Sequence, residues 1–124
     1  MSVHDAKPTA DDAWIAVCAS SRLIEGAGVA ALVEGTQVAL FHLADIEDGV
    51  FAVGNYDPIG GANVISRGIV GDVQGEPVVA SPLYKQHFSL LDGRCLEDGE
   101  QSLPTYPVRV CGDQVWLKRS DIRG

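Results

Sequence analysis

The chain lacks most of the features that reveal a binding or catalytic role directly. It has three cysteines without a C-x-x-C pair and three histidines without an H-x-x-x-H spacing, so the common zinc motifs are absent. Its nine basic residues form no cluster and its net charge is −8. The sequence therefore lacks the basic surface that nucleic acids and anionic membranes attract, and we expect neither as a partner.

Long apolar runs are missing too. No run approaches the length that spans a bilayer, and the first twelve residues have no apolar segment like that of a signal peptide. We expect a cytoplasmic protein. Cys18, Cys95 and Cys111 each have an apolar neighbour, and we expect buried free thiols, because reactive thiols need an exposed, electropositive setting.

Motifs for nucleophilic catalysis and for nucleotide binding are not found. Ser66 and Ser81 have no G-x-S-x-G context, and no cysteine has a histidine nearby in the sequence. Glycines gather at Gly60-Gly61 and over residues 68–75, but no G-x-G-x-x-G joins a strand to a helix. We expect no catalytic, cofactor-binding or metal-binding residue on this chain.

The size and composition indicate one domain with its own core. The chain has 124 residues, of which 46% are hydrophobic, enough to bury a core without metal or disulfide. We expect a tail over residues 1–12, one domain over 13–119 and a short tail over 120–124. The acidic charge lies mainly in residues 1–62, with nine acidic and two basic side chains, and this half is a candidate contact for a basic partner surface.

Short runs of strand-forming residues alternate with turn residues, and no stretch shows sustained helical periodicity. The pattern predicts an all-β sandwich or small barrel. Residues 59–75, rich in glycine, are expected to form an irregular excursion. The expected strands are Trp14–Cys18, Gly28–Val33, Gln37–Leu43, Val50–Val53, Pro77–Ala80, His87–Leu90, Tyr106–Cys111 and Gln114–Lys118.

Two of these strands matter for the packing. Gln37–Leu43 has apolar residues on both faces, which predicts a strand in the interior of the structure. Glu34-Gly35-Thr36 before it suits a hairpin loop, and Gly112-Asp113 suits the turn of a second hairpin before Gln114–Lys118.

Two loops carry a resemblance to a known family. One contains Asn55-Tyr56-Asp57-Pro58-Ile59 after an apolar strand, and the other reads Ser81-Pro82-Leu83-Tyr84 and is followed by a short apolar strand and an Asp92-Gly93 turn. They resemble the cluster-binding loops of Rieske domains, which read C-x-H and C-P-x-H. The resemblance implies an antiparallel β-sandwich with two protruding loops, and it places Asp57, Ile59, Ser81 and Tyr84 at the ligand positions.

A Rieske cluster needs two thiolates and two imidazoles. At these positions Asp57 offers a carboxylate, Ser81 a neutral hydroxyl and Tyr84 a phenol. Ile59 offers no donor at all. We therefore expect no two-iron cluster on this chain. His87 and Asp57 could be neighbours across the loops, but two ligands make neither a structural nor a catalytic zinc site.

Three motifs narrow the resemblance to one branch, the small subunits of NAD(P)H-dependent assimilatory nitrite reductases. They are Asn55-x-Asp57-Pro58, the segment 62–72 and the segment 81–86, in order and at compatible spacing. The resemblance implies a non-catalytic accessory subunit of an enzyme that reduces nitrite to ammonium. FAD, an iron–sulfur cluster and sirohaem would then belong to its large subunit. Two alternatives are a Rieske-type ferredoxin, which the missing ligands disfavour, and a free-standing β-sandwich that binds another protein.

The loop tips are the candidate contact with a partner. An apolar residue, an aromatic hydroxyl and a few charges are typical of protein interfaces. Ile59 and Tyr84 could instead fold inward and fill the space of the cluster. Arg67 could pair with Asp57 or Asp72. The candidate contact residues are Ile59, Arg67, Tyr84, Lys85, Gln86 and His87.

Overall fold

The computed structural model describes residues 14–46 and 49–118 of the chain. In this part every regular element is a β-strand or a one-turn 3-10 helix, so the predicted all-β class is confirmed. None of the helices in the described ranges is long and apolar enough to cross a membrane. The tails predicted at residues 1–12 and 120–124 lie outside the described residues.

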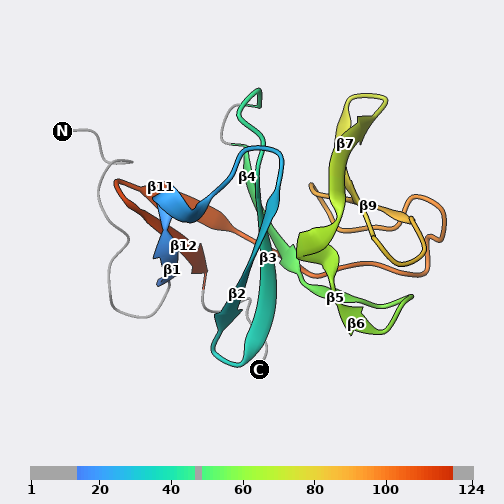
Figure 1. Ribbon diagram of the computed structural model, residues 1–124, viewed down its shortest axis with the longest axis horizontal. Helices are drawn as coiled ribbons and strands as arrows, with labels where there is room; N and C mark the ends of the chain where they lie inside the picture. Colours follow the sequence, from blue (N-terminus) through green and yellow to red (C-terminus); the bar gives the residue numbers. More distant parts are fainter. Residues whose placement is uncertain (1–13, 47–48, 119–124) are drawn as a thin grey trace.

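The strands form three principal sheets, which follow one another along the long axis of the molecule (Figure 1). The terminal sheet has the order β1 (Trp14–Ala19), β12 (Gln114–Lys118), β11 (Val108–Cys111). The central sheet has the order β10 (Thr105–Tyr106), β4 (Val50–Gly54), β3 (Thr36–His42), β2 (Gly28–Val33). The loop-side sheet has the order β7 (Ile69–Val73), β8 (Glu76–Ala80), β9 (His87–Ser89), and a small ribbon pairs β5 (Tyr56–Asp57) with β6 (Ala62–Asn63). All pairs of strands are antiparallel.

Strand β3 supplies side chains to two cores because it is buried on both faces. Val38 and Leu40 pack with residues of the terminal sheet such as Leu117. Ala39 and Phe41 point to the other side and pack with residues of the loop-side sheet, including Val79 and Phe88. The prediction that residues 37–43 form an interior strand is confirmed, since alternating side chains of one strand face opposite layers.

Two hairpins are closed by two-residue turns in which both residues have positive φ. In the β2–β3 turn, Glu34 and Gly35 have φ of 50° and 84°, and in the β7–β8 turn Gln74 and Gly75 have 52° and 86°. Such turns match the twist of the paired strands. The expected loop at residues 34–36 is therefore one residue shorter, because Thr36 already belongs to β3.

Two expectations about the strands are wrong. Residues 59–75 are not irregular: they contain β6, the 3-10 helix η3 (Ile65–Arg67) and β7. The stretch Tyr106–Cys111 is not one strand, because Pro107 separates β10 in the central sheet from β11 in the terminal sheet. Proline has no amide hydrogen to continue a ladder, so the chain changes sheets there.

The cysteines do not form disulfides. Cys95 and Cys111 are buried and Cys18 is partly buried, and all three are free thiols, as expected. Burial raises the pKa of the Cys18 thiol, an effect that the nearby Arg22 only partly offsets. Their burial is typical of thiols that pack as small apolar side chains, and the Cys95 thiol also donates a hydrogen bond to Oε1 of Glu97 at 3.8 Å.

Candidate functional site: the two-loop end

Asp57 joins the two loops. Its carboxylate is fully buried, and one oxygen, Oδ1, accepts hydrogen bonds from the backbone amides of Ile59 at 2.8 Å and Gly60 at 3.0 Å. The other oxygen, Oδ2, accepts a hydrogen bond from the hydroxyl of Ser81 in the second loop. We call this arrangement the Asp57–Ser81 clasp; it fixes the shape of the first loop and ties it to the second.

The second loop is folded around Ser81. The Ser81 carbonyl accepts a hydrogen bond from the Lys85 amide at 3.0 Å, and the Ser81 amide donates one to the Gln86 carbonyl at 2.9 Å. The Ser81 hydroxyl also accepts a hydrogen bond from the Leu83 amide at 3.2 Å. Lys85 closes the loop with a φ of 67°, a conformation that non-glycine residues seldom adopt. The tip is thus held by three hydrogen bonds, all of which involve Ser81.

Asn55 connects the first loop to the central sheet. Its side-chain amide donates to Oε1 of Gln37 at 3.0 Å, and its Oδ1 accepts a hydrogen bond from the Ser66 amide at 2.7 Å. Its carbonyl accepts a hydrogen bond from the Ile65 amide at 3.1 Å. This buried side chain therefore positions both the loop and η3 against β3.

The residues at the four predicted ligand positions do not fit a two-iron cluster. The Asp57 oxygens are engaged by loop amides and by Ser81, and oxygen donors are a poor match for iron–sulfur chemistry. Ile59 has no donor and packs against the core beneath the loops. In the described ranges, no three His, Cys, Asp or Glu side chains come together as a metal site.

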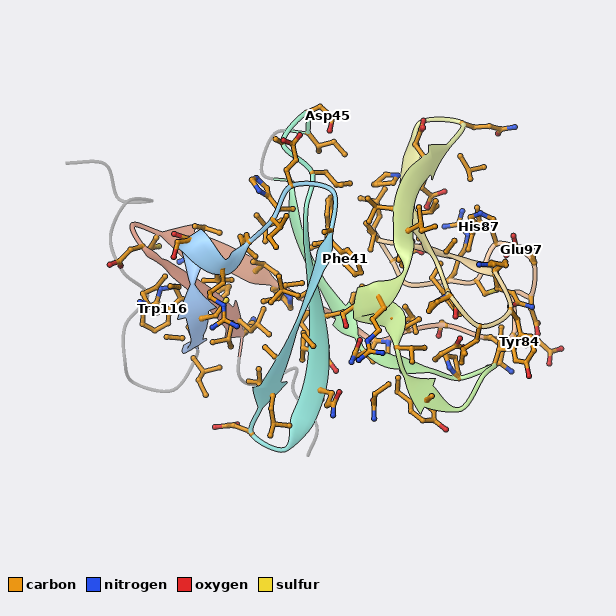
Figure 2. All side chains as sticks on the ribbon, in the orientation of Figure 1. Phe41, Asp45, Tyr84, His87, Glu97 and Trp116 are labelled. Carbon is orange, nitrogen blue, oxygen red and sulfur yellow. The ribbon has the colours of Figure 1, made fainter. Side chains whose placement is uncertain are left out.

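The side chains of Ile59 and Tyr84 differ in their exposure to solvent. Ile59 is partly buried against the hydrophobic core that contains Phe41 and Phe88, whereas the Tyr84 side chain is 64% exposed and stands at the far end of the molecule (Figure 2). Of the two possibilities left open by the sequence, Ile59 follows the inward one and Tyr84 the outward one. Only the second loop thus presents its ligand-position side chain to solvent.

Two more apolar side chains are exposed at this end, and sequence reasoning did not select them. Tyr56 is 53% and Leu83 is 43% exposed. A Cβ at Gly60 would lie 2.3 Å from Cδ1 of Leu83, so this glycine lets the two loops touch. The two loop motifs could have indicated them, since Tyr56 immediately precedes Asp57 in the first motif and Leu83 immediately precedes Tyr84 in the second. Leu83 adjoins Tyr84 at the exposed tip of the second loop, whereas Tyr56 is exposed on strand β5 of the first.

Arg67 does not make either of the predicted ion pairs. It lies in η3 and is exposed, while Asp57 is buried and bonded to the loops. The ion pairs among the described residues join Arg94 to Glu76 and Asp92, and His87 to Glu97. Backbone amides and a serine hydroxyl provide the hydrogen bonds that an arginine would have given Asp57.

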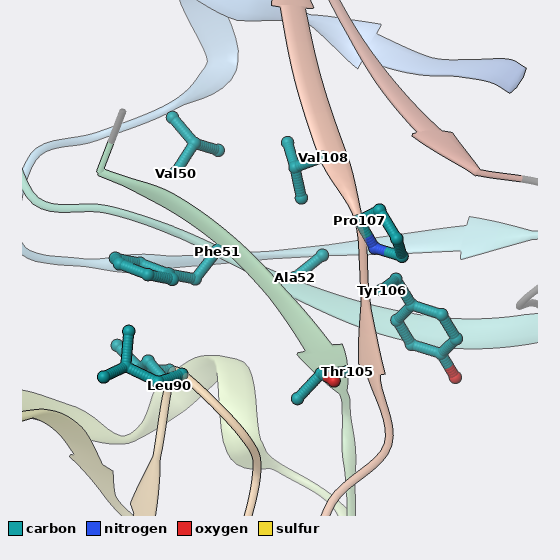
Figure 3. A pocket seen from close by; sticks show the side chains of 9 residues that line it. Val50, Phe51, Ala52, Leu90, Thr105, Tyr106, Pro107 and Val108 are labelled. Atoms are coloured by element: carbon teal, nitrogen blue, oxygen red, sulfur yellow. The ribbon is translucent and has the colours of Figure 1, made fainter. Parts of the chain in front are cut away.

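A pocket of about 310 Å³ lies beside the loop-side sheet, between β4, Leu90 and residues 105–108 (Figure 3). Its lining contains apolar side chains and the hydroxyl-bearing Thr105 and Tyr106, but no carboxylate, imidazole, amine or thiol. Burial raises the pKa of the Tyr106 phenol. The pocket therefore lacks a group suited to general acid or base catalysis near neutral pH.

Two carboxylates of the loop-side half of the molecule, those of Glu97 and Glu76, are paired. The His87 amide and ring donate to Glu97 at 2.8 and 2.6 Å, and the two oxygens of Glu76 accept hydrogen bonds from Arg94 at 2.9 and 3.0 Å. Burial opposes ionisation of Glu97, but the hydrogen bonds from His87 outweigh it and lower the pKa. The Arg94 guanidinium, followed by the Ser89 hydroxyl, holds the pKa of Glu76 below its usual range.

These lowered pKa values predict a loss of stability in acid. A carboxyl with a lower pKa in the folded state stabilises the protein above its unfolded pKa of about 4.3, and that contribution disappears as the pH falls. The free energy of unfolding, measured with urea from about pH 7 to pH 3, should decrease below about pH 4.5. Glu76→Gln should make this decrease shallower, whereas Glu100→Gln, an exposed control outside the network, should not. If the free energy of unfolding depended on pH equally in Glu76→Gln and in the unmodified protein, Glu76 would not contribute to the loss of stability in acid.

Comparisons with known proteins identify the family to which the fold belongs. Residues 13–118 match the family model of the Rieske-like [2Fe-2S] domain. The chain is 45% identical over 105 residues to the nitrite reductase (NADH) small subunit of Salmonella typhimurium, covering 85% of this chain and 96% of that one. The solution structure of the nitrite reductase [NAD(P)H] small subunit from Erwinia carotovora is 44% identical, with a TM-score of 0.73, over 90% of this chain and 82% of that one.

A further match concerns a much larger protein. The chain is 43% identical over 104 residues to the nitrite reductase [NAD(P)H] large subunit of Klebsiella oxytoca. The match covers 84% of this chain but only 11% of that relative, so a domain of this kind is one part of a longer polypeptide there. The match of residues 13–118 to the family model and the identity to the Salmonella protein both show that this chain belongs to the Rieske-like domain family, in its branch of nitrite reductase small subunits.

Proposed function

We propose that this chain is the non-catalytic small subunit of a cytoplasmic NAD(P)H-dependent nitrite reductase, which reduces nitrite to ammonium in nitrate and nitrite assimilation. The observation that carries the proposal is the 45% identity to a nitrite reductase (NADH) small subunit over 96% of that protein. A similarity of this extent includes both loops and all three sheets. The chain is thus a part of an oxidoreductase without an active site of its own.

The partner is the large subunit of the same enzyme. The match inside the Klebsiella oxytoca large subunit supports this pairing, because two domains that occur in one polypeptide in one organism often associate as separate chains in another. FAD, an iron–sulfur cluster and sirohaem belong to the large subunit in this proposal. The small subunit contributes a rigid surface that orients or stabilises that catalytic chain.

The two-loop end is the proposed contact. The buried Asp57–Ser81 clasp holds both loops without a metal, and Ile59 fills the space beneath them. Tyr84 and Lys85 are exposed at the tip and are followed in the chain by the partly buried Gln86 and His87. The exposed Arg67 in η3 is a further candidate contact. A surface that is already ordered loses little conformational entropy on binding, which favours a stable complex.

A Rieske-type ferredoxin remains the alternative from another functional class. Its role requires a cluster that passes single electrons, and the donors at the loop positions do not fit one. Absorption in the visible range of the purified protein separates the two functions, since a two-iron cluster is coloured. A free-standing binding module would not bind a nitrite reductase large subunit, so co-purification of the two chains separates that alternative from the proposal.

Co-expression with the large subunit tests the proposal directly. The two chains should purify together, and NAD(P)H-dependent nitrite reduction should be higher with this chain than without it. A large subunit that neither binds this chain nor changes in activity or stability would overturn the proposal, and the binding-module alternative would then be favoured.

The double variant Tyr84→Ala, Lys85→Ala tests the contact. It should weaken binding to the large subunit by about 10- to 100-fold, because exposed aromatic side chains dominate many interfaces, and it should change the melting temperature by less than about 2 °C. Binding is measured by titration calorimetry. Leu32→Ala, which removes a 72% exposed side chain from strand β2, is the matched control and should bind normally. A large fall in melting temperature would instead give Tyr84 a structural role.

A further inference from the structure

The outer face of the terminal sheet has a composition unlike the rest of the surface. Ile15 and Leu117 pack into the core, so the alternate residues of β1 and β12, Trp14 and Trp116, belong to the opposite face. Arg109 pairs with Trp116 in the β11–β12 ladder, and its Cζ lies 4.6 Å from the centroid of the Trp14 ring. We call these three residues the Trp–Arg face.

The charge of this sheet is opposite to that of the whole molecule. Its three strands contain two cationic residues, Arg109 and Lys118, and no Asp or Glu, although the chain carries a net charge of −8. A cationic patch on an acidic protein provides a local attraction for an anionic group on a partner. The Trp–Arg face therefore suits a partner surface that contains a carboxylate.

This face lies at the end of the molecule opposite to the loops. Trp116 and Tyr84 stand at opposite ends of the long axis (Figure 2). Strand β1 begins at Trp14, which pairs with Lys118 at the end of β12. The described domain therefore starts and finishes side by side, on the terminal sheet.

The position of the two ends of the domain matters in the longer relative, where the domain must be joined to the rest of the polypeptide. In the Klebsiella oxytoca large subunit the matching segment covers 11% of the chain, so the remaining polypeptide must join it through one or both of its ends. If that segment has the same fold, the join is at the terminal sheet, whatever the order of the domains. In that relative the rest of the polypeptide would then connect on the side of the terminal sheet, at the end of the domain opposite to the loop tip.

We propose that the Trp–Arg face is a second contact with the large subunit. It binds an apolar surface of that subunit that bears a carboxylate. This rests on the function proposed above. Tryptophan and arginine are the residue types that most often anchor interfaces. A guanidinium stacked on an indole keeps its N–H edges free to bind a carboxylate through two hydrogen bonds. Contacts at both ends of a rigid domain would fix its orientation and strengthen binding through effective concentration.

Fluorine NMR can observe this face selectively. The chain has two tryptophans in total, and both belong to the Trp–Arg face, so a 5-fluorotryptophan-labelled small subunit reports on it alone. Addition of the unlabelled large subunit should change the chemical shift of the Trp14 resonance, which is assigned through the variant Trp116→Phe; line broadening alone reports only the slower tumbling of the complex. Saturating binding, confirmed by calorimetry, with both chemical shifts unchanged would overturn the proposal.

Charge reversal tests the same contact by affinity. Arg109→Glu should weaken binding of the full-length chain to the large subunit by at least about tenfold, with a melting temperature near that of the unmodified protein. Arg22→Glu, a charge reversal in the 3-10 helix η2 (Ser20–Arg22), is the matched control and should bind normally. Normal binding by Arg109→Glu, together with weakened binding by the Tyr84 and Lys85 variant, would overturn the second contact and leave the proposed function standing. No binding by the unmodified chain would overturn both.

Discussion

Replacing Asp57 by alanine should lower the free energy of unfolding by about 3–5 kcal/mol. The substitution leaves the amides of Ile59 and Gly60 and the hydroxyl of Ser81 without their acceptor. Each unsatisfied buried donor costs about 1–3 kcal/mol, and water that enters the gap recovers part of this. Urea unfolding at neutral pH, followed by circular dichroism, measures the loss.

The partner residue supplies the control for this prediction. Ser81→Ala should cost only about 1–2 kcal/mol, because the two backbone amides keep their acceptor. The double variant should cost less than the sum of the single ones, since both remove the same bond, and the coupling should be about 1 kcal/mol or more. Strict additivity, or a loss below about 1 kcal/mol for Asp57→Ala, would show that the clasp contributes little.

The second large effect is expected from Gly28→Ala, with a loss of about 3 kcal/mol and a melting temperature about 10 °C lower. A Cβ at Gly28 would lie 2.2 Å from the backbone oxygen of Ser66 and 2.7 Å from Cε1 of Phe41. A backbone atom cannot rotate away as a side chain can, so η3 would have to move off β2. Differential scanning calorimetry measures the change.

Gly71→Ala is the matched control for this effect. Gly71 also lies in a strand, and a Cβ there would meet no atom within 4 Å. This substitution should be neutral or slightly stabilising, because alanine restricts the unfolded chain more than glycine does. Similar melting temperatures for the two variants would contradict the close packing of η3 against β2.

Much of the scaffold could be predicted from periodicity. The apolar residues on both faces of the segment 37–43 indicated an interior strand, and Val38 and Phe41 indeed face two different cores. The second loop could be placed because it lies between two apolar runs and contains a proline, whereas the first loop was placed through the resemblance to the Rieske family. Patterns of this kind are local, so the sequence shows them without knowledge of the tertiary structure.

The features that could not be predicted depend on distant groups or on rare conformations. The segment 59–75 was expected to be irregular because it is rich in glycine, yet it contains the β7–β8 hairpin. Gln74 has positive φ in the turn of that hairpin, a conformation that glutamine seldom adopts, so the turn could not be predicted from its residues. The partner of Asp57 was sought among charged residues such as Arg67, but the structure gives it amides and Ser81. A carboxylate can be satisfied by any nearby donor, and the sequence does not show which donor the fold brings close.

The pairing of the first strand with the last affects how the chain is made. Trp14 finds its partner only when Lys118 has been synthesised, so β1 emerges from the ribosome long before its ladder can form. Contacts between residues so far apart in the sequence slow folding and leave apolar side chains such as Ile15 uncovered in the meantime. The terminal sheet should therefore be among the last parts to fold, and a protein that stops before β12 should be recognised by chaperones rather than accumulate as a folded domain.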